Sequence, residues 1–195
     1  MKTTLISSEI QQLETYSKQG DSYTDNNGRY GWRNPIRTDT GSLLTGLVIS
    51  TAPKHILEIG TGHGLSTLYL ASGLEVPYAA TIDSIEFDPG VAASTQARMN
   101  DCKAPVTVHT GDALDVIAQL EGYFDLVFLD AQKNMYLSHL LALMARNLIG
   151  AGTVILADNV VDRQVECQSF LDWFVDEGVN HEIIPTECGL LVARL

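Results

Sequence analysis

The sequence predicts an α/β fold: a doubly wound sheet of about seven strands, mostly parallel, with one antiparallel strand near the C-terminus. Two observations predict it. Short apolar segments alternate with helical segments between residues 55 and 176, and such βαβ alternation is typical of a parallel sheet with helices on both faces. The last two apolar runs, residues 181–184 and 189–193, are separated by Pro185-Thr186-Glu187-Cys188. That connection is too short for a helical crossover, so the two runs are expected to form an antiparallel hairpin.

The expected elements follow one another without a linker. A helix at residues 5–18 precedes a loop at residues 20–35 that is rich in Gly, Asp, Asn and Tyr. A second helix starts at Thr38 and ends before Pro53, because proline disfavours a helical conformation in the residue before it. The alternation then predicts strands at residues 55–59, 79–85, 106–109, 124–129 and 153–157, and helices at residues 65–72, 89–100, 113–120, 134–148 and 164–176. We expect one domain over residues 1–195, with residues 1–37 as an N-terminal helix and a lid or oligomer segment.

Composition narrows the range of partners. The chain has 195 residues, of which 45% are hydrophobic, enough for one well-buried domain. Its formal net charge of −12 argues against a nucleic-acid partner, since such proteins usually present a basic face to the phosphates. No apolar run approaches the roughly 18 residues that span a bilayer, so no membrane partner and a soluble, cytoplasmic location are expected. The scattered cysteines Cys102, Cys167 and Cys188 suggest neither a disulfide framework nor a zinc site.

Three glycines lie where the first strand of the alternating region meets its helix. Gly60, Gly62 and Gly64 can bring the backbone close to a ligand at a positive helix N-terminus. The dinucleotide fingerprint requires G-x-G-x-x-G, whereas here the spacing is G-x-G-x-G and Leu65 occupies the third glycine position. The spacing therefore disfavours NAD. A tight turn without any ligand is the alternative.

Acidic residues follow the next two strands at the edge of the sheet where ligands bind. Glu86 lies at the tip of its strand, where its carboxylate could accept both hydroxyls of a ribose. Asp83 is the competing acid, but its position within the strand favours Glu86. Asp112 could accept a hydrogen bond from an adenine amino group or could simply cap the helix that follows it, and both readings stay open.

These segments together resemble the class I S-adenosylmethionine-dependent methyltransferases. The resemblance rests on residues 58–66, Glu86 and Gly111-Asp112-Ala113, and the closing hairpin fits the last antiparallel strand of that family. It implies a Rossmann-like fold and S-adenosylmethionine as the cofactor. The cofactor-binding residues that it implies are Glu58, Gly60, Gly62, Ser66, Glu86, Asp112, Ala113 and Asp130.

Oxygen donors follow the fourth and fifth expected strands. Asp130, Asp158 and Asn159 would lie on neighbouring strand tips, and hard oxygen donors with open positions suit Mg²⁺ or another divalent cation such as Mn²⁺ or Ca²⁺. Each residue alone could be an ordinary Asx turn. Lys133 follows closely and could act as a general base toward a hydroxyl of the acceptor. A solvated surface lysine is the alternative.

The arrangement is similar to catechol O-methyltransferase and the related caffeoyl-CoA O-methyltransferases. The matching segments are Leu129-Asp130-Ala131-Gln132-Lys133 and Ala157-Asp158-Asn159, and Trp32 falls where catechol O-methyltransferases have a tryptophan bordering the substrate. The resemblance implies metal-dependent O-methylation, with Asp130 and Lys133 as catalytic residues and Trp32, Lys133 and Asn159 near the substrate. It also implies a possible homodimer.

The resemblance leaves the acceptor open. Between Asn159 and Gln168 the connection is shorter than in catechol O-methyltransferase, and Val175 stands where that enzyme has a glutamate that binds the second catechol hydroxyl. A hydroxylated small molecule with adjacent oxygens, catechol-like or similar, is the expected acceptor. The alternatives are a non-aromatic natural product or sugar hydroxyl, a non-catalytic S-adenosylmethionine-binding protein and, more remotely, a dehydrogenase.

Overall fold

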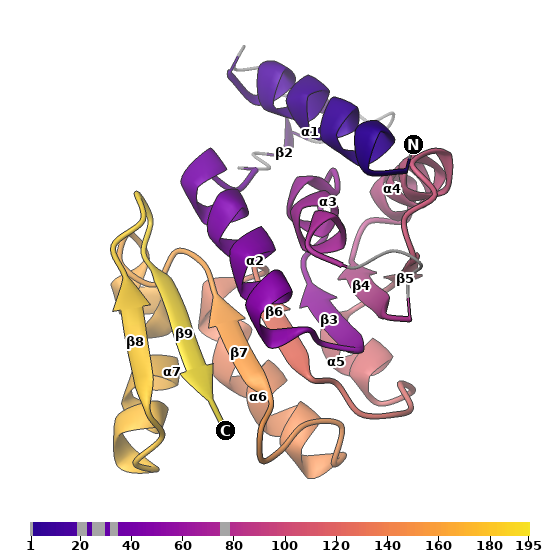
Figure 1. The fold of residues 1–195 in the computed structure, drawn as a ribbon. Helices are drawn as coiled ribbons and strands as arrows, with labels where there is room; N and C mark the ends of the chain where they lie inside the picture. Colours follow the sequence, from indigo (N-terminus) through magenta and orange to yellow (C-terminus); the bar gives the residue numbers. More distant parts are fainter. Residues whose placement is uncertain (1, 19–22, 25–29, 32–34, 75–78) are drawn as a thin grey trace.

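Two buried apolar clusters, one on each face of a central sheet, organise the chain. The computed structural model describes residues 2–18, 23–24, 30–31, 35–74 and 79–195 (Figure 1). The strands of the central sheet are β3 (His55–Ile59), β4 (Thr81–Glu86), β5 (Val106–Thr110), β6 (Leu126–Leu129), β7 (Val154–Ala157), β8 (His181–Ile184) and β9 (Leu190–Arg194). The helices are α1 (Lys2–Lys18), α2 (Thr38–Thr51), α3 (Leu65–Ser72), α4 (Pro89–Asp101), α5 (Ala113–Ile117), α6 (Tyr136–Ala145) and α7 (Gln164–Asp176).

Strand β6 shows how the two clusters arise. All four of its residues are buried, and because side chains alternate along a strand, Leu126 and Phe128 belong to one cluster and Val127 and Leu129 to the other. The first cluster includes residues of α1, α2 and α3, and the second includes residues of α5, α6 and α7. A sheet covered by helices on both faces explains why its central strands are continuous apolar runs.

The strand order is β5-β4-β3-β6-β7-β9-β8. Strands β3 to β7 pair in parallel, whereas β9 pairs antiparallel with both β7 and β8. The prediction of a doubly wound, seven-stranded sheet with one antiparallel strand near the C-terminus is therefore confirmed for the described residues. From β3 the chain winds outward to β5 and returns to β6 beside β3. The carboxyl ends of β3 and β6 thus form the switch point at which ligands bind in such sheets.

Several expected boundaries were wrong. The expected helix at residues 134–148 begins instead with a 3-10 turn, η1 (Lys133–Met135), and α6 ends at Ala145. Asn147 has φ 54°, a left-handed conformation that a helix cannot continue. Within the expected loop at residues 20–35, β1 (Tyr23–Thr24) and β2 (Tyr30–Gly31) pair antiparallel. One domain over residues 1–195 stays a prediction, as does a lid or oligomer role for residues 1–37.

The sequence predicted that no segment spans a membrane, and this prediction can be compared with the length and apolarity of the helices. No helix in the described ranges is both long and apolar enough to cross a bilayer. A cytoplasmic location stays a prediction.

Candidate active site

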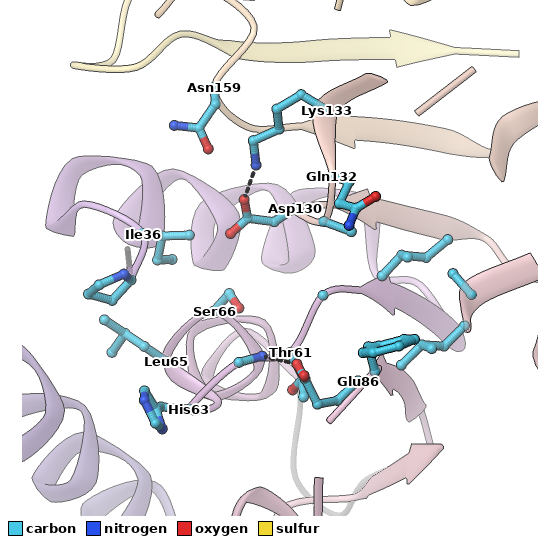
Figure 2. A pocket seen from close by; sticks show the side chains of 18 of the residues that line it. Ile36, Thr61, His63, Leu65, Ser66, Glu86, Asp130, Gln132, Lys133 and Asn159 are labelled. Atoms are coloured by element: carbon cyan, nitrogen blue, oxygen red, sulfur yellow. Dashed lines mark hydrogen bonds and ion pairs between the residues drawn. The ribbon is translucent and has the colours of Figure 1, made fainter. Parts of the chain in front are cut away.

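A cavity of about 500 Å³ opens at the switch point between β3 and β6 (Figure 2). Its wall is built by the segments at the carboxyl ends of five parallel strands, β3, β4, β5, β6 and β7, together with residues just before α2. Residues predicted to bind a cofactor and residues predicted to act in chemistry therefore share one cavity. Those that line it are Gly60, Gly62, Ser66, Glu86, Ala113, Asp130, Lys133 and Asn159.

The glycine loop after β3 has the conformation that its sequence requires. Gly60 has φ 102°, and a Cβ atom at this position would overlap the carbonyl oxygen of Asp130 at the end of β6. Gly62 has φ 48° and no atoms within 4 Å of the place where its Cβ would lie. Gly60 thus allows the two strand ends to touch, and Gly62 leaves space beside the cavity.

Glu58 supports this loop from behind the cavity wall. Its carboxylate is fully buried and accepts hydrogen bonds of 2.5 Å each from the hydroxyls of Ser66, Thr67 and Ser84. Burial raises the pKa of Glu58, although these hydroxyl donors lower it. Glu58 does not line the cavity, whereas Ser66 does. The geometry therefore makes Glu58 a residue that fixes the start of α3, and a direct cofactor contact by Glu58 stays a prediction.

Glu86 connects the tip of β4 to the glycine loop. Its two carboxylate oxygens accept hydrogen bonds from the backbone amides of Gly62 and Asp88, each at 3.0 Å. The competing acid, Asp83, faces elsewhere: its Oδ1 lies 2.6 Å from Nε2 of His109, and it does not line the cavity. The structure thus orients Glu86 toward the cavity, with lone pairs left over for a ligand.

Asp112 caps α5. Its Oδ1 accepts a hydrogen bond of 2.9 Å from the backbone amide of Leu114, and its side chain is exposed. The neighbours Gly111 and Ala113 line the cavity, but Asp112 does not. The capping interpretation therefore describes Asp112 in this structure, and its contact with an adenine stays a prediction.

Asp130 and Lys133 form an ion pair at the cavity wall. Lys133 Nζ lies 2.7 Å from Asp130 Oδ1, and each side chain is 14% exposed. Burial raises the pKa of Asp130 to about 6, although the Lys133 ammonium lowers it. Lys133 Nζ also lies 5.3 Å from the centroid of the Tyr136 ring. The η1 turn thus directs the lysine back over the strand tip and away from bulk water.

Asp158 is a buried carboxylate with an unused oxygen. Its Oδ1 has no hydrogen-bond partner, and the residue is 2% exposed. Burial, and next the charge of Asp130, raises the pKa of Asp158 to about 7. An unpartnered buried carboxylate oxygen is costly unless something compensates it. Asp158 does not itself line the cavity, but its neighbour Asn159 does.

Two of the three predicted metal ligands, Asp130 and Asn159, line this end of the cavity. Asn159 and Asp130 point toward the same space beside Lys133 (Figure 2). In the described part of the chain, no three His, Cys, Asp or Glu side chains form a group that could hold a metal ion. The predicted set instead has two carboxylates and an amide. Its hard oxygen donors and the unpartnered Asp158 oxygen fit a divalent cation, although cation binding stays a prediction.

One predicted substrate residue cannot be placed, and several residues that were not predicted line the cavity. Trp32 lies outside the described residues, so its predicted position beside the substrate is not tested. The cavity is also lined by residues that the sequence reasoning missed, among them Ile36, Phe87, Asp162, Arg163 and Glu166. Phe87 directly follows the predicted tip residue Glu86, and Asp162, Arg163 and Glu166 lie in the short connection after Asn159, so the positions of these four residues in the sequence could have indicated them.

Relatives of known sequence resemble this chain over much of its length. A family profile described as a methyltransferase domain matches residues 57–160. The chain is 34% identical over 132 residues to catechol O-methyltransferase from Niastella koreensis, covering 65% of this chain and 58% of that protein. It is 35% identical over 128 residues to catechol O-methyltransferase from Sus scrofa, covering 62% of this chain and 68% of that protein. The chain spans about half the length of the Bos taurus and Mus musculus catechol O-methyltransferases, 50% and 51%.

Solved structures agree on the fold. The O-methyltransferase TomG from Streptomyces achromogenes, involved in tomaymycin synthesis and solved in complex with SAM, superimposes with a TM-score of 0.74 at 26% identity, covering 83% of this chain and 81% of that one. The O-methyltransferase from Bacillus cereus in complex with SAH gives a TM-score of 0.78 at 23% identity, covering 96% of this chain and 91% of that one.

Proposed function

Since this chain belongs to the S-adenosylmethionine-dependent O-methyltransferases of the catechol and caffeoyl-CoA type, we propose that it methylates a hydroxyl of a small acceptor with adjacent oxygens. We propose further that a divalent cation assists the reaction. One observation carries the proposal: the glycine loop and Glu86 line the same cavity as the Asp130–Lys133 ion pair and Asn159. A cofactor and an acceptor bound there would lie side by side.

The cofactor end of the cavity suits S-adenosylmethionine. Glu86 can accept ribose hydroxyls with its remaining lone pairs, since a carboxylate has about four acceptor sites and two are used by backbone amides. Gly60, Gly62, Ser66 and Ala113 line the cavity. In this proposal the first three would border the methionine part and Ala113 the adenine. The SAM complex of the similar enzyme TomG supports S-adenosylmethionine as the cofactor.

Asp130, Asp158 and Asn159 would hold the cation, with Mg²⁺, Mn²⁺ or Ca²⁺ as candidates. When bound, such a cation would lower the pKa of an acceptor hydroxyl, as metals do for water. The two acids offer the negative charge and Asn159 the neutral oxygen of a small, open site. Two observations support a cation at this site. The chain is similar to catechol O-methyltransferases, and the buried Oδ1 of Asp158 has no hydrogen-bond partner.

Lys133 is the base in this proposal. In its neutral form Nζ accepts the proton of the acceptor hydroxyl, and the resulting oxygen attacks the methyl carbon of the sulfonium. The carbon–sulfur bond breaks with its electron pair on sulfur, which leaves S-adenosylhomocysteine and the methyl ether. The 2.7 Å contact with Asp130 Oδ1 places Nζ at the cavity wall, and the ammonium formed by the proton transfer can pair with that carboxylate. Fixing base, acceptor and cofactor in one cavity converts an encounter of separate molecules into a unimolecular step.

A methyl-transfer screen tests the proposal. The protein would be incubated with S-adenosylmethionine, with and without Mg²⁺, over catechols, hydroxycinnamoyl esters and vicinal-diol sugars. We expect Mg²⁺-dependent transfer to an acceptor with adjacent oxygens. Transfer to sugars alone would indicate a non-aromatic acceptor, whereas calorimetric binding of S-adenosylmethionine without transfer to any acceptor would indicate a cofactor-binding protein without turnover.

A further inference from the structure

The segment that follows β7 contains an acidic side chain outside the predicted ligand set. Asp162 lines the cavity, and its Oδ2 accepts a hydrogen bond of 3.3 Å from Nδ2 of Asn159. The side chain of Asp162 is 41% exposed, and its Oδ2 also lies 4.0 Å from Nε of Arg163. Asn159 is thus held through its nitrogen by a neighbour on the same short connection.

This contact decides which end of the Asn159 amide faces the cavity. An amide group has one donating and one accepting end, whereas an ionised carboxylate can only accept. If the amide were turned over, its oxygen would face the Asp162 carboxylate, and two acceptors would repel each other. Figure 2 shows the observed orientation, with the Asn159 oxygen on the side of Asp130 and Lys133 and the nitrogen directed away from them.

The backbone of this segment is fixed from a distant part of the sequence. The amides of Val161 and Asp162 donate to the carbonyl of Cys188 at 3.0 and 3.4 Å, in the turn between β8 and β9. Asn159 itself has φ 65°, a left-handed conformation that asparagine tolerates better than most residues. The hairpin therefore holds the turn in which Asp162 can reach Asn159.

We propose that Asp162 is a positioning residue that orients the Asn159 amide so that its oxygen is presented to a divalent cation. The role rests on the proposed function, since it concerns the same cation. Groups that orient metal ligands typically change metal affinity by about 10–100-fold when they are removed. Asp162 supplies this orientation from the short connection between β7 and α7.

Binding of Mn²⁺ to the cofactor-free protein, measured by the electron paramagnetic resonance of free Mn²⁺, tests the role without any methyl transfer. Asp162→Ala should raise the Kd for Mn²⁺ by at least about tenfold. Asp162→Asn should retain most of the affinity, because its side-chain oxygen can still accept the Asn159 hydrogen bond. Asp176→Asn, which removes an exposed carboxylate at the end of α7, is the control for lost charge and should leave the Kd within about twofold.

A second pair of variants separates orientation from charge. In an Asn159→Asp background both ends of the side chain are oxygens, so adding Asp162→Ala should cause no further loss of Mn²⁺ affinity. That result would also show that the Ala variant folds. Equal losses for Asp162→Ala and Asp162→Asn, persisting in the Asn159→Asp background, would overturn the positioning role while leaving the cation site intact. Absence of Mn²⁺ binding by the parent protein would overturn the cation site and, with it, this role.

Discussion

The carbonyl oxygen of Asp130 occupies the space that a side chain on Gly60 would need. This contact joins the end of β3 to the end of β6 at the switch point of the sheet. The loop assigned to the cofactor and the strand tip assigned to the chemistry are therefore in direct backbone contact. A change at either position is expected to disturb both.

Gly60→Ala should destabilise the fold on the order of 3 kcal/mol, because it adds a strained positive φ to a steric overlap. Urea denaturation would measure this loss, and calorimetry should detect weaker S-adenosylmethionine binding in the folded fraction. Gly46→Ala in α2 is a matched control, since nothing lies within 4 Å of its Cβ position. It should be neutral or stabilising by about 0.5–1 kcal/mol. If the two variants were equally stable, the close approach of Gly60 to the carbonyl oxygen of Asp130 would be contradicted.

Phe87 lines the cavity but was not predicted from the sequence, and its substitution tests whether the adenine binds beside it. Its side chain is 71% exposed although it lines the cavity, so a bound adenine would cover apolar surface there. Phe87→Ala should raise the Kd for S-adenosylmethionine by about tenfold, as expected for losing roughly 1.5 kcal/mol of apolar contact. Ile49→Ala, at an exposed apolar position of α2, is the control. An unchanged Kd for Phe87→Ala would place the adenine elsewhere.

The acidic strand tips predict an unusual pH dependence of stability in metal-free buffer. Burial raises the pKa of Asp158 to about 7 and that of Asp130 to about 6. Between about pH 4 and pH 7 the folded state therefore holds protons that the unfolded chain has released, so stability falls as the pH rises. We expect the free energy of unfolding to be on the order of 4 kcal/mol lower at pH 8 than at pH 5, because the two groups together release protons over about three pH units at 1.36 kcal/mol per unit.

Asp158→Asn isolates this effect because the amide cannot ionise. Urea denaturation in chelator-containing buffer at both pH values should show a much smaller difference for the variant than for the parent chain. Adding Mg²⁺ at pH 8 should stabilise the parent chain but not the variant. If the parent chain and the variant showed the same change in stability between pH 5 and pH 8, an ionising, buried Asp158 would be ruled out.

Lys133→Met should lower kcat by about 10²–10⁴-fold, the range expected for loss of a general base. S-adenosylmethionine affinity, measured by calorimetry, should change little, because the ammonium pairs with Asp130 and not with the cofactor loop. Lys133→Arg keeps the ion pair but offers no neutral base at ordinary pH, so it should be as slow as Lys133→Met. Full activity of Lys133→Arg would remove the lysine from the mechanism.

Much of the fold could be predicted because its signals are local. The four consecutive apolar residues Leu126–Leu129 are all buried, and such a continuous apolar run is typical of a central parallel strand. The grouping of Glu86, Asp130 and Asn159 followed from one rule, that the carboxyl ends of parallel strands share an edge. The boundaries of α6 were less predictable, because a 3-10 turn, η1, precedes it and Asn147 after it adopts a left-handed conformation that a helix cannot continue.

The parts that escaped prediction depend on contacts between distant residues. The hydrogen bonds to Glu58 include one from Ser84, which comes from the neighbouring strand β4. The position of Asp162 depends on Cys188 in the β8–β9 turn. Neither contact leaves a pattern in the local sequence. Glu58 was therefore assigned to direct cofactor binding, whereas its contacts point to support of the loop, and Asp162 was not assigned at all.

The most direct test of metal-dependent O-methylation compares Asp158→Ala with the parent chain on the best acceptor from the screen, in chelator-treated buffer to which Mg²⁺ is added stepwise. Asp176→Ala serves as the control. The parent chain and the control should turn over only when Mg²⁺ is present. Asp158→Ala should be slower by at least about a hundredfold at every Mg²⁺ concentration, as expected when several kcal/mol of charge stabilisation are lost. Full turnover by Asp158→Ala in the chelator-treated buffer without Mg²⁺ would contradict the proposal.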